Sequence, residues 1–130
     1  MRSSHGDTLS ILVVEDDEAT AELVRAVLND VAGWGCTVVH DAAAAREVFR
    51  HVRIEVLVLD VNLPGITGLE LLELLRRDPH WDEPPVILMS ANADNPDLQT
   101  AIRRTATLQF IPKPFDVDDL VLAVEASVAA

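Results

Sequence analysis

Five short aliphatic runs recur along the chain, and each is followed by a segment of helical character. The runs cover residues 11–15, 36–40, 55–60, 85–90 and 108–113. They are mostly continuous rather than alternating, as strands covered on both faces are. Strands that are separated by helix-length segments form a parallel sheet with helices on both sides. The alternation therefore predicts a doubly wound α/β fold with a five-stranded parallel sheet and five helices.

Local signals place the helices between these runs. A first helix is predicted over 18–31, where apolar residues recur at helical spacing: Leu23, Val24, Val27, Leu28 and Val31. Asp41 is the predicted N-cap of a second helix over 42–52. Thr67 and Glu70 form a capping box that opens a third helix, which ends at Asp78-Pro79. Pro96 suits the first turn of a fourth helix that runs to about residue 106, and Asp116 is the predicted N-cap of the last helix.

Composition limits the function classes. The net charge is −12 and no basic face is visible, which argues against nucleic-acid binding by this domain. No apolar run approaches the roughly 20 residues of a membrane span, and the N-terminus lacks the apolar core of a signal peptide. The single cysteine, Cys36, excludes an internal disulfide and fits a cytoplasmic location. We expect a tail over 1–9 and one domain over 10–130.

Polar side chains stand where four of the five strands end. Glu15 and Asp16 follow the first strand, Asp60 ends the third, Ser90 the fourth and Lys113 the fifth. Parallel strands place their carboxyl ends at one edge of the sheet, and ligands of such sheets bind there. Each residue alone is ordinary at a strand end, as a turn or capping residue. Their combination predicts one cleft with three carboxylates, a hydroxyl and an ammonium group.

Such a cleft suits phosphoryl transfer. Three close carboxylates repel one another unless a cation joins them, and Mg²⁺ prefers oxygen ligands, water and phosphate. Lys113 and Ser90 can bind phosphate oxygens, and Asp60 is the candidate nucleophile that accepts the phosphoryl group. Cys36, the two tryptophans and the four histidines are interpreted as packing or surface residues, including His40, which ends the second strand to one side of the cleft.

Four motifs in this order resemble the receiver domain of two-component response regulators. They are "ILVVEDDE", "VLVLDVNLPGITGLELL", "VILMSA" and "FIPKPF", and the resemblance covers residues from about 10 to 128. It implies a flavodoxin-like receiver fold with strand order 2-1-3-4-5. It further implies these roles: Mg²⁺ ligation by Glu15, Asp16, Asp60 and the backbone carbonyl of Asn62, phosphorylation of Asp60, phosphoryl contacts from Ser90 and from Lys113 before Pro114, and an aromatic switch at Phe110.

Two positions depart from the family pattern. Ala106-Thr107 replaces a common Gly-Ala pair, which removes a glycine suited to end a helix. Phe110 lacks the hydroxyl of a switch tyrosine. Neither change affects the phosphorylation chemistry.

The resemblance implies a phospho-accepting signalling switch, and two alternatives compete with it. An aspartyl-phosphate phosphatase places a second acid two residues after its nucleophile, where this chain has Asn62, which cannot titrate. A pseudo-receiver, which only binds, typically lacks one of the acids or the lysine, and all are present here. We therefore expect a phosphoryl acceptor rather than an enzyme.

The implied donor is a histidine kinase or a histidine phosphotransfer protein. It is expected to dock on the first helix, whose outward face is predicted to present Asp17, Glu18, Ala21 and Arg25. Phosphorylation is expected to change the surface formed by the fourth helix, the fifth strand and the last helix. A downstream protein or an output domain would read that surface.

Overall fold

The computed structural model describes residues 9–105 and 107–129, and its centre is one parallel sheet. The strands are β1 (Ser10–Val14), β2 (Gly35–Val39), β3 (Val56–Asp60), β4 (Val86–Ser90) and β5 (Leu108–Pro112). They are ordered β2-β1-β3-β4-β5, and every neighbouring pair is parallel. The predicted fold class and strand order are confirmed.

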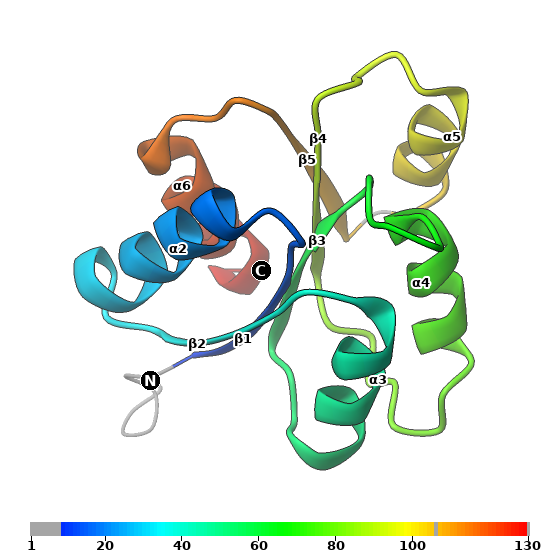
Figure 1. The fold of residues 1–130 in the computed structure, drawn as a ribbon, viewed down its shortest axis with the longest axis horizontal. Helices are drawn as coiled ribbons and strands as arrows, with labels where there is room; N and C mark the ends of the chain where they lie inside the picture. Colours follow the sequence, from blue (N-terminus) through cyan, green and yellow to red (C-terminus); the bar gives the residue numbers. More distant parts are fainter. Residues whose placement is uncertain (1–8, 106, 130) are drawn as a thin grey trace.

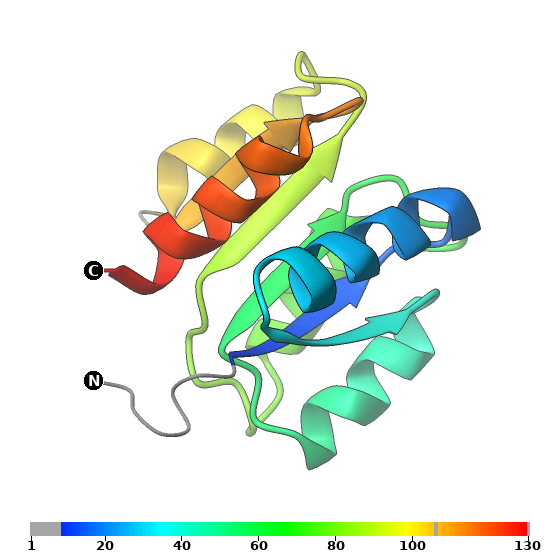
Figure 2. The same cartoon turned by 90° about the vertical axis from the view of Figure 1, so that its left-hand side faces the viewer.

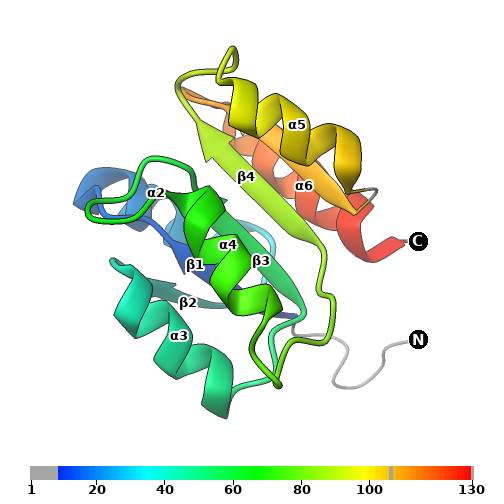
Figure 3. The ribbon, with the colours of Figure 1, turned by 90° about the vertical axis from the view of Figure 1, so that its right-hand side faces the viewer.

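Helices cover both faces of this sheet (Figure 1). In the described residues they are α2 (Glu18–Ala26), α3 (Ala42–His51), α4 (Gly68–Arg76), α5 (Pro96–Arg104) and α6 (Val117–Ala129), with a π-helical turn η1 (Val27–Val31) directly after α2. Figure 2 shows α2 and α6 in front of one face, and Figure 3 shows α3, α4 and α5 in front of the other. The five helices therefore divide two and three between the faces.

The core has two halves, one on each face of the sheet. Strand residues alternate between them: Leu57 and Leu59 pack under α3, α4 and α5, whereas Val56 and Val58 pack under α2 and α6. All five residues of β3, and all five of β4, are buried. The central strands are therefore rigid supports for the residues at their ends.

The predicted helix starts are present with capping hydrogen bonds. Asp17 and Asp41 accept backbone N–H bonds at the starts of α2 and α3. Thr67 and Glu70 form the predicted capping box of α4, with both reciprocal bonds made. Asn95 caps α5, in which Pro96 occupies the first turn. These caps lie in the segments that follow the strand ends, so they fix where the loops of the cleft turn into helices.

The first helix departs from its prediction. It is α-helical only to Ala26, and the π-helical turn η1 follows. A π turn holds more residues than an α-helical turn, so the side chains after Ala26 no longer follow the α-helical spacing. Val24, Val27 and Leu28 are buried as predicted. Leu23 and Val31 are 44% and 73% exposed, so the apolar stripe is narrower than the sequence spacing indicated.

Other element ends differ by small shifts. The strands are five residues each, and α5 ends at Arg104 rather than near residue 106. The predicted irregularity at Ala106-Thr107 falls partly outside the described residues, which omit Ala106.

Leu9, which the sequence placed in the tail, is buried and its carbonyl accepts the Gly35 N–H at 2.8 Å. Most of the proposed tail, residues 1–8, lies outside the described part.

A side-chain link ties β5 to α6. Gln109 Nε2 donates to the Ala123 carbonyl at 2.9 Å and to Ser127 Oγ at 2.7 Å, and Ser127 Oγ donates to the same carbonyl. Leu120 and Val124, on the inner face of α6, are buried.

Among the described residues, no helix is both long and apolar enough to cross a membrane.

Candidate functional site

The carboxyl ends of the strands meet at one edge of the sheet, and the buried polar residues gather there. Among the described residues, the buried polar side chains are Glu15, Asp60 and Ser90, at 0%, 3% and 0% exposure. Each stands at the end of β1, β3 or β4. Burying an ionisable group is costly unless it has a partner or a role. The burial of these three therefore marks the edge as the candidate site.

Three carboxylates lie close enough to share a cation. One oxygen from each of Glu15, Asp16 and Asp60 can be chosen so that all three lie within 4.8 Å of one another. Glu15 and Asp60 are buried, whereas Asp16 is exposed. The buried pair supplies fixed oxygen ligands, and the exposed side leaves room for water and a phosphate. This donor set fits Mg²⁺, which binds a few carboxylates and keeps several waters.

Lys113 joins the carboxylates. Its Nζ lies 2.6 Å from Glu15 Oε1 and 3.3 Å from Asp60 Oδ2. Its backbone N–H donates to the Ser90 carbonyl at 2.9 Å, which fixes the lysine beside β4, and its bond to Pro114 is cis. Burial lowers the pKa of Lys113, but the contacts with Glu15 and Asp60 outweigh it and hold the pKa above its usual value. Lys113 is therefore a firmly positive charge within the site.

Glu15 is held on both carboxylate oxygens. Oε1 accepts from Lys113, and Oε2 accepts the backbone N–H of Asp17 at 3.1 Å. Burial raises the pKa of Glu15 despite these two bonds, and the nearby Asp60 raises it further. The direction follows from desolvation of the charged form combined with a like charge beside it. A cation bound between the acids would relieve both costs.

Asp60 is fixed by its own loop. Its Oδ1 accepts the backbone N–H of Asn62 at 3.0 Å, so Oδ2 is the oxygen that faces Lys113. The first turn of α4 lies against the same loop, since the Gly68 N–H donates to the Val61 carbonyl at 2.7 Å. A β-carbon on Gly68 would stand 2.8 Å from Val61 Cα. Only glycine allows this close approach behind Asp60.

Ser90 and Phe110 stand beside this arrangement. The Ser90 hydroxyl accepts the Asn92 N–H at 3.0 Å and donates to the Asn92 carbonyl at 3.3 Å. Phe110 is half-buried in β5 and packs against the core under α3, α4 and α5. The hydroxyl is thus engaged with its own loop, and the aromatic ring lies on the β5 face away from α6.

The sequence interpretation missed one residue at the site. The ring of His40 lies with Nδ1 2.9 Å from the Glu15 carbonyl oxygen. His40 was placed to one side of the cleft, and β2 is indeed an edge strand, next to β1. A polar residue at the end of a strand adjacent to the acid pair was the available signal. The position of this strand to one side of the cleft did not indicate that the His40 side chain reaches the Glu15 carbonyl.

The predicted docking face of the first helix needs a correction. Ala21 was expected to face outward, but it is 1% exposed. Leu23 is a large apolar residue of this helix that is exposed, and it lines a hollow of about 290 Å³ with Thr20, Ala91, Lys113, Pro114 and Phe115. Ala21 stands three residues before Val24 and seven before Leu28, so it lies on the buried stripe that these residues form.

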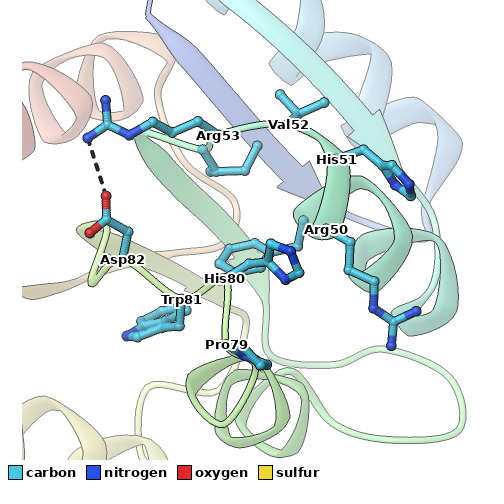
Figure 4. A pocket seen from close by; sticks show the side chains of 10 residues that line it. Arg50, His51, Val52, Arg53, Pro79, His80, Trp81 and Asp82 are labelled. Carbon is cyan, nitrogen blue, oxygen red and sulfur yellow. Dashed lines mark hydrogen bonds and ion pairs between the residues drawn. The ribbon is translucent and has the colours of Figure 1, made fainter.

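A second pocket, of about 390 Å³, lies away from these residues (Figure 4). The loops that follow α3 and α4 form it, and Phe49 stacks on Trp81 in its wall with ring centroids 5.6 Å apart. In it, Arg53 pairs with Asp82 at 3.3 Å, and the His80 ring nitrogen Nδ1 lies 2.8 Å from Asp78 Oδ1. It contains none of the acids or the lysine of the strand ends. The packing and surface roles expected for Trp81, His51 and His80 agree with this location.

Comparison with known proteins agrees with the geometry. Residues 11–125 match the family model described as the response regulator receiver domain. The chain is 34% identical over 128 residues to "Probable transcriptional regulatory protein TcrX" of Mycobacterium tuberculosis, which covers 97% of this chain and 52% of that protein. It is 33% identical over 116 residues to the DNA-binding response regulator MtrA of Mycobacterium leprae, with 89% and 49% covered. The chain thus spans about half the length of these relatives.

Solved structures show the same fold. The receiver domain of the Francisella response regulator 1452 superposes with a TM-score of 0.78 at 26% identity, covering 92% of this chain and 96% of that one. The chemotaxis response regulator CheY4 of Vibrio cholerae has a TM-score of 0.82 at 21% identity, covering 93% and 99%. With this fold, this arrangement of strand-end residues and a family match over most of its length, the chain belongs to the response regulator receiver domain family.

Proposed function

We propose that this domain accepts a phosphoryl group on Asp60. The single observation that supports it best is the pairing of a buried carboxylate with an ammonium group. Asp60 is 3% exposed, and its Oδ2 lies 3.3 Å from Lys113 Nζ. The strand holds the carboxylate in place, and the lysine sits where the incoming phosphate would carry negative charge. Positioning and charge stabilisation are the main contributions to phosphoryl transfer.

The acids at the site would hold Mg²⁺. Glu15, Asp16 and Asp60 supply the carboxylates, and the backbone carbonyl of Asn62 is the fourth protein group that we assign to it. When bound, Mg²⁺ would neutralise charge on the transferred phosphoryl group. Binding is expected to be weak, because Mg²⁺ gives up its waters reluctantly and retains several of them at protein sites.

In the transfer itself, Asp60 is the acceptor and a phosphohistidine is the donor. An Asp60 carboxylate oxygen attacks the phosphorus of a phosphohistidine, the phosphorus–nitrogen bond breaks, and an acyl phosphate forms. The imidazole of the donor leaves with the electron pair of the broken bond and takes a proton from water. Lys113 is already charged and placed beside Asp60, so it can bind a phosphoryl oxygen without moving far.

A switch follows from the new contacts of the phosphate. Ser90 would exchange its bonds with Asn92 for a bond to a phosphoryl oxygen, which pulls the loop after β4 toward Asp60. That movement frees space near Phe110, which we expect to turn inward. The surface of α5, β5 and α6 then changes, and the two states differ by the contacts made at the phosphate.

The proposed donor is a histidine kinase or a histidine phosphotransfer protein. The apolar hollow beside Lys113, with Leu23 exposed at its edge, offers a docking surface next to Asp60. We place this exchange in the cytoplasm, where the single cysteine stays reduced. The domain extends over residues 10–130 in this proposal, and the partner that reads it is a downstream protein or an output domain.

DNA binding is not assigned to this domain. The net charge of −12 opposes contact with phosphate backbones, although the relative MtrA is named as a DNA-binding protein. The matched segment covers 49% of MtrA, so the DNA-binding activity in its name belongs to a protein about twice as long as this segment. Catalytic turnover is likewise not assigned, because Asn62 stands where an aspartyl-phosphate phosphatase has its general acid.

Labelling with acetyl phosphate tests the proposal. In the presence of Mg²⁺, the wild-type domain should gain one phosphoryl group, seen as a mass increase in intact-protein mass spectrometry. The Asp60→Asn variant keeps the size and the hydrogen bond to Asn62 but lacks the nucleophile, so it should gain none. Peptide mapping should locate the group on Asp60. Full labelling of the variant would overturn the assignment.

A further inference from the structure

A histidine outside the set of proposed ligands contacts the peptide that joins two of them. His40 Nδ1 lies 2.9 Å from the Glu15 carbonyl oxygen, in a partly buried contact. A carbonyl oxygen only accepts hydrogen bonds, so Nδ1 must carry the proton and donate. The Glu15 carbonyl belongs to the planar peptide unit that connects Glu15 to Asp16. Holding this oxygen therefore fixes the plane from which Asp16 departs.

Residues at the end of β2 contact both the N–H and the carbonyl oxygen of Glu15. The Glu15 N–H donates to the Val39 carbonyl at 3.0 Å, which continues the parallel pairing in which Val14 lies beside Val39. In a continuing ladder, the Glu15 carbonyl would accept from a backbone N–H of β2. In the described part of the chain, the donor that reaches it is the His40 ring. The side chain thus supplies the last rung of the ladder at the site.

The orientation of the Asp16 carboxylate depends on the hydrogen bond from His40 more than the orientations of Glu15 and Asp60 do. Glu15 is held by Lys113 and the Asp17 N–H, and Asp60 by Lys113 and the Asn62 N–H. The exposed Asp16 carboxylate has no hydrogen-bond partner among the described residues. Its direction is therefore set by its backbone, and the backbone on its N-terminal side is the peptide that His40 contacts.

We propose that His40 is a positioning residue for the metal site, because its ring N–H holds the Glu15–Asp16 peptide and so directs the Asp16 carboxylate toward Asp60. The inference rests on the proposed function, since it requires that Asp16 is a Mg²⁺ ligand. Partners that orient metal ligands commonly affect metal affinity although they never touch the ion. The loss of one ordinary hydrogen bond corresponds to about a fivefold change in affinity.

The test measures Mg²⁺ affinity by titration, followed through backbone amide signals in NMR spectra, for five proteins. They are the wild type, His40→Ala, His40→Asn, His51→Ala and Asp16→Ala. Asparagine places an amide N–H where the ring Nδ1 stands, so it can restore the bond. His51 is the matched control, because its Nδ1 also lies 2.9 Å from a backbone carbonyl, that of Glu47, on an exposed helix end. Asp16→Ala defines the affinity of a site without that ligand.

We expect His40→Ala to weaken Mg²⁺ binding by about fivefold, with His40→Asn and His51→Ala close to the wild type. Thermal unfolding without Mg²⁺ is measured in parallel to separate positioning from folding. If His40→Ala lowers the unfolding temperature but leaves the Mg²⁺ affinity unchanged, the bond is only structural and the inference is overturned. Unchanged affinity in Asp16→Ala would instead overturn the proposed metal site itself, and with it this inference.

Discussion

Gly68 lies directly against the peptide bond that follows Asp60. A β-carbon at position 68 would come within 2.9 Å of the Asp60 carbonyl carbon and 2.8 Å of Val61 Cα. Both neighbours are main-chain atoms at the end of a fully buried strand, so neither can move aside cheaply. The first turn of α4 and the proposed phosphorylation site are therefore one packed unit, and the helix serves as the rear wall of the site.

Gly68→Ala should destabilise the domain and slow phosphorylation. Alanine favours a helix over glycine by up to about 1 kcal/mol, but overpacking against a fixed backbone costs about 1–3 kcal/mol. Thermal unfolding and acetyl phosphate labelling measure the two effects. Gly65→Ala is the control: φ is +85° there and the space is open, so strain should lower stability without affecting Asp60. Equal labelling rates in both variants would contradict the packing argument.

Leu23→Gln should slow phosphorylation by a histidine kinase and spare acetyl phosphate. The change keeps the size of the side chain but removes an exposed apolar contact beside Lys113. With a purified kinase that phosphorylates the wild type, we expect a rate about tenfold lower, as for loss of 1.4 kcal/mol of contact. Val31→Gln, at the far end of the same helical segment, should match the wild type. If both donors slow equally for Leu23→Gln, the site itself has been disturbed.

Replacement of Asn62 or Asn92 by a large side chain should lengthen the life of the phosphorylated state. Both residues follow strand ends at the cleft and are exposed. Their short, neutral amides can hydrogen-bond a water that attacks the acyl phosphate but cannot block it. We therefore expect slower phosphate release from Asn62→Met and Asn92→Tyr than from the wild type. Asn92 also accepts the Asp94 N–H at 3.1 Å, so unfolding is measured as well. Unchanged release in both variants would show that access is controlled elsewhere.

Cys36 should be slow to react with thiol reagents while the domain is folded. Burial raises the pKa of the Cys36 thiol to about 11, against a smaller opposing effect of Arg25. The reactive thiolate at pH 8 is then on the order of 100-fold scarcer than for an ordinary cysteine. A disulfide reagent followed by absorbance measures the rate, with the protein in denaturant as the control. Equal rates in the folded and denatured protein would show that the thiol is accessible.

The sheet and the location of the site could be predicted from the sequence for the same reason. Continuous aliphatic runs between capped helices require a parallel sheet, and a parallel sheet brings its strand ends together. Asp41, Thr67 and Glu70 cap helices as predicted, because capping depends on residues only three positions apart. Glu15 and Asp60, 45 positions apart, were placed together by topology, without knowledge of any side-chain contact.

Features that depend on helix rotation and side-chain reach could not be predicted in this way. The π turn after Ala26 and the exposure of Leu23 and Val31 result from how α2 packs on the sheet, which the spacing of its apolar residues leaves uncertain by part of a turn. The ring of His40 reaches the Glu15 carbonyl because β2 ends level with β1. Such register is set by the folded pairing and is not visible in either segment alone.

The hydrogen bond between Gln109 and Ser127 limits where another protein can be fused to the C-terminal end of α6. Ser127 lies in the last turn of α6, yet its hydroxyl accepts from a β5 side chain and donates to the Ala123 carbonyl. A chimera that joins this domain to a foreign reporter before that turn would lose the bond from Gln109 to Ser127 that ties the last turn of α6 to the sheet. The fusion point therefore belongs after Ser127, so that a signal from the proposed acceptor Asp60 would reach an intact helix at the junction.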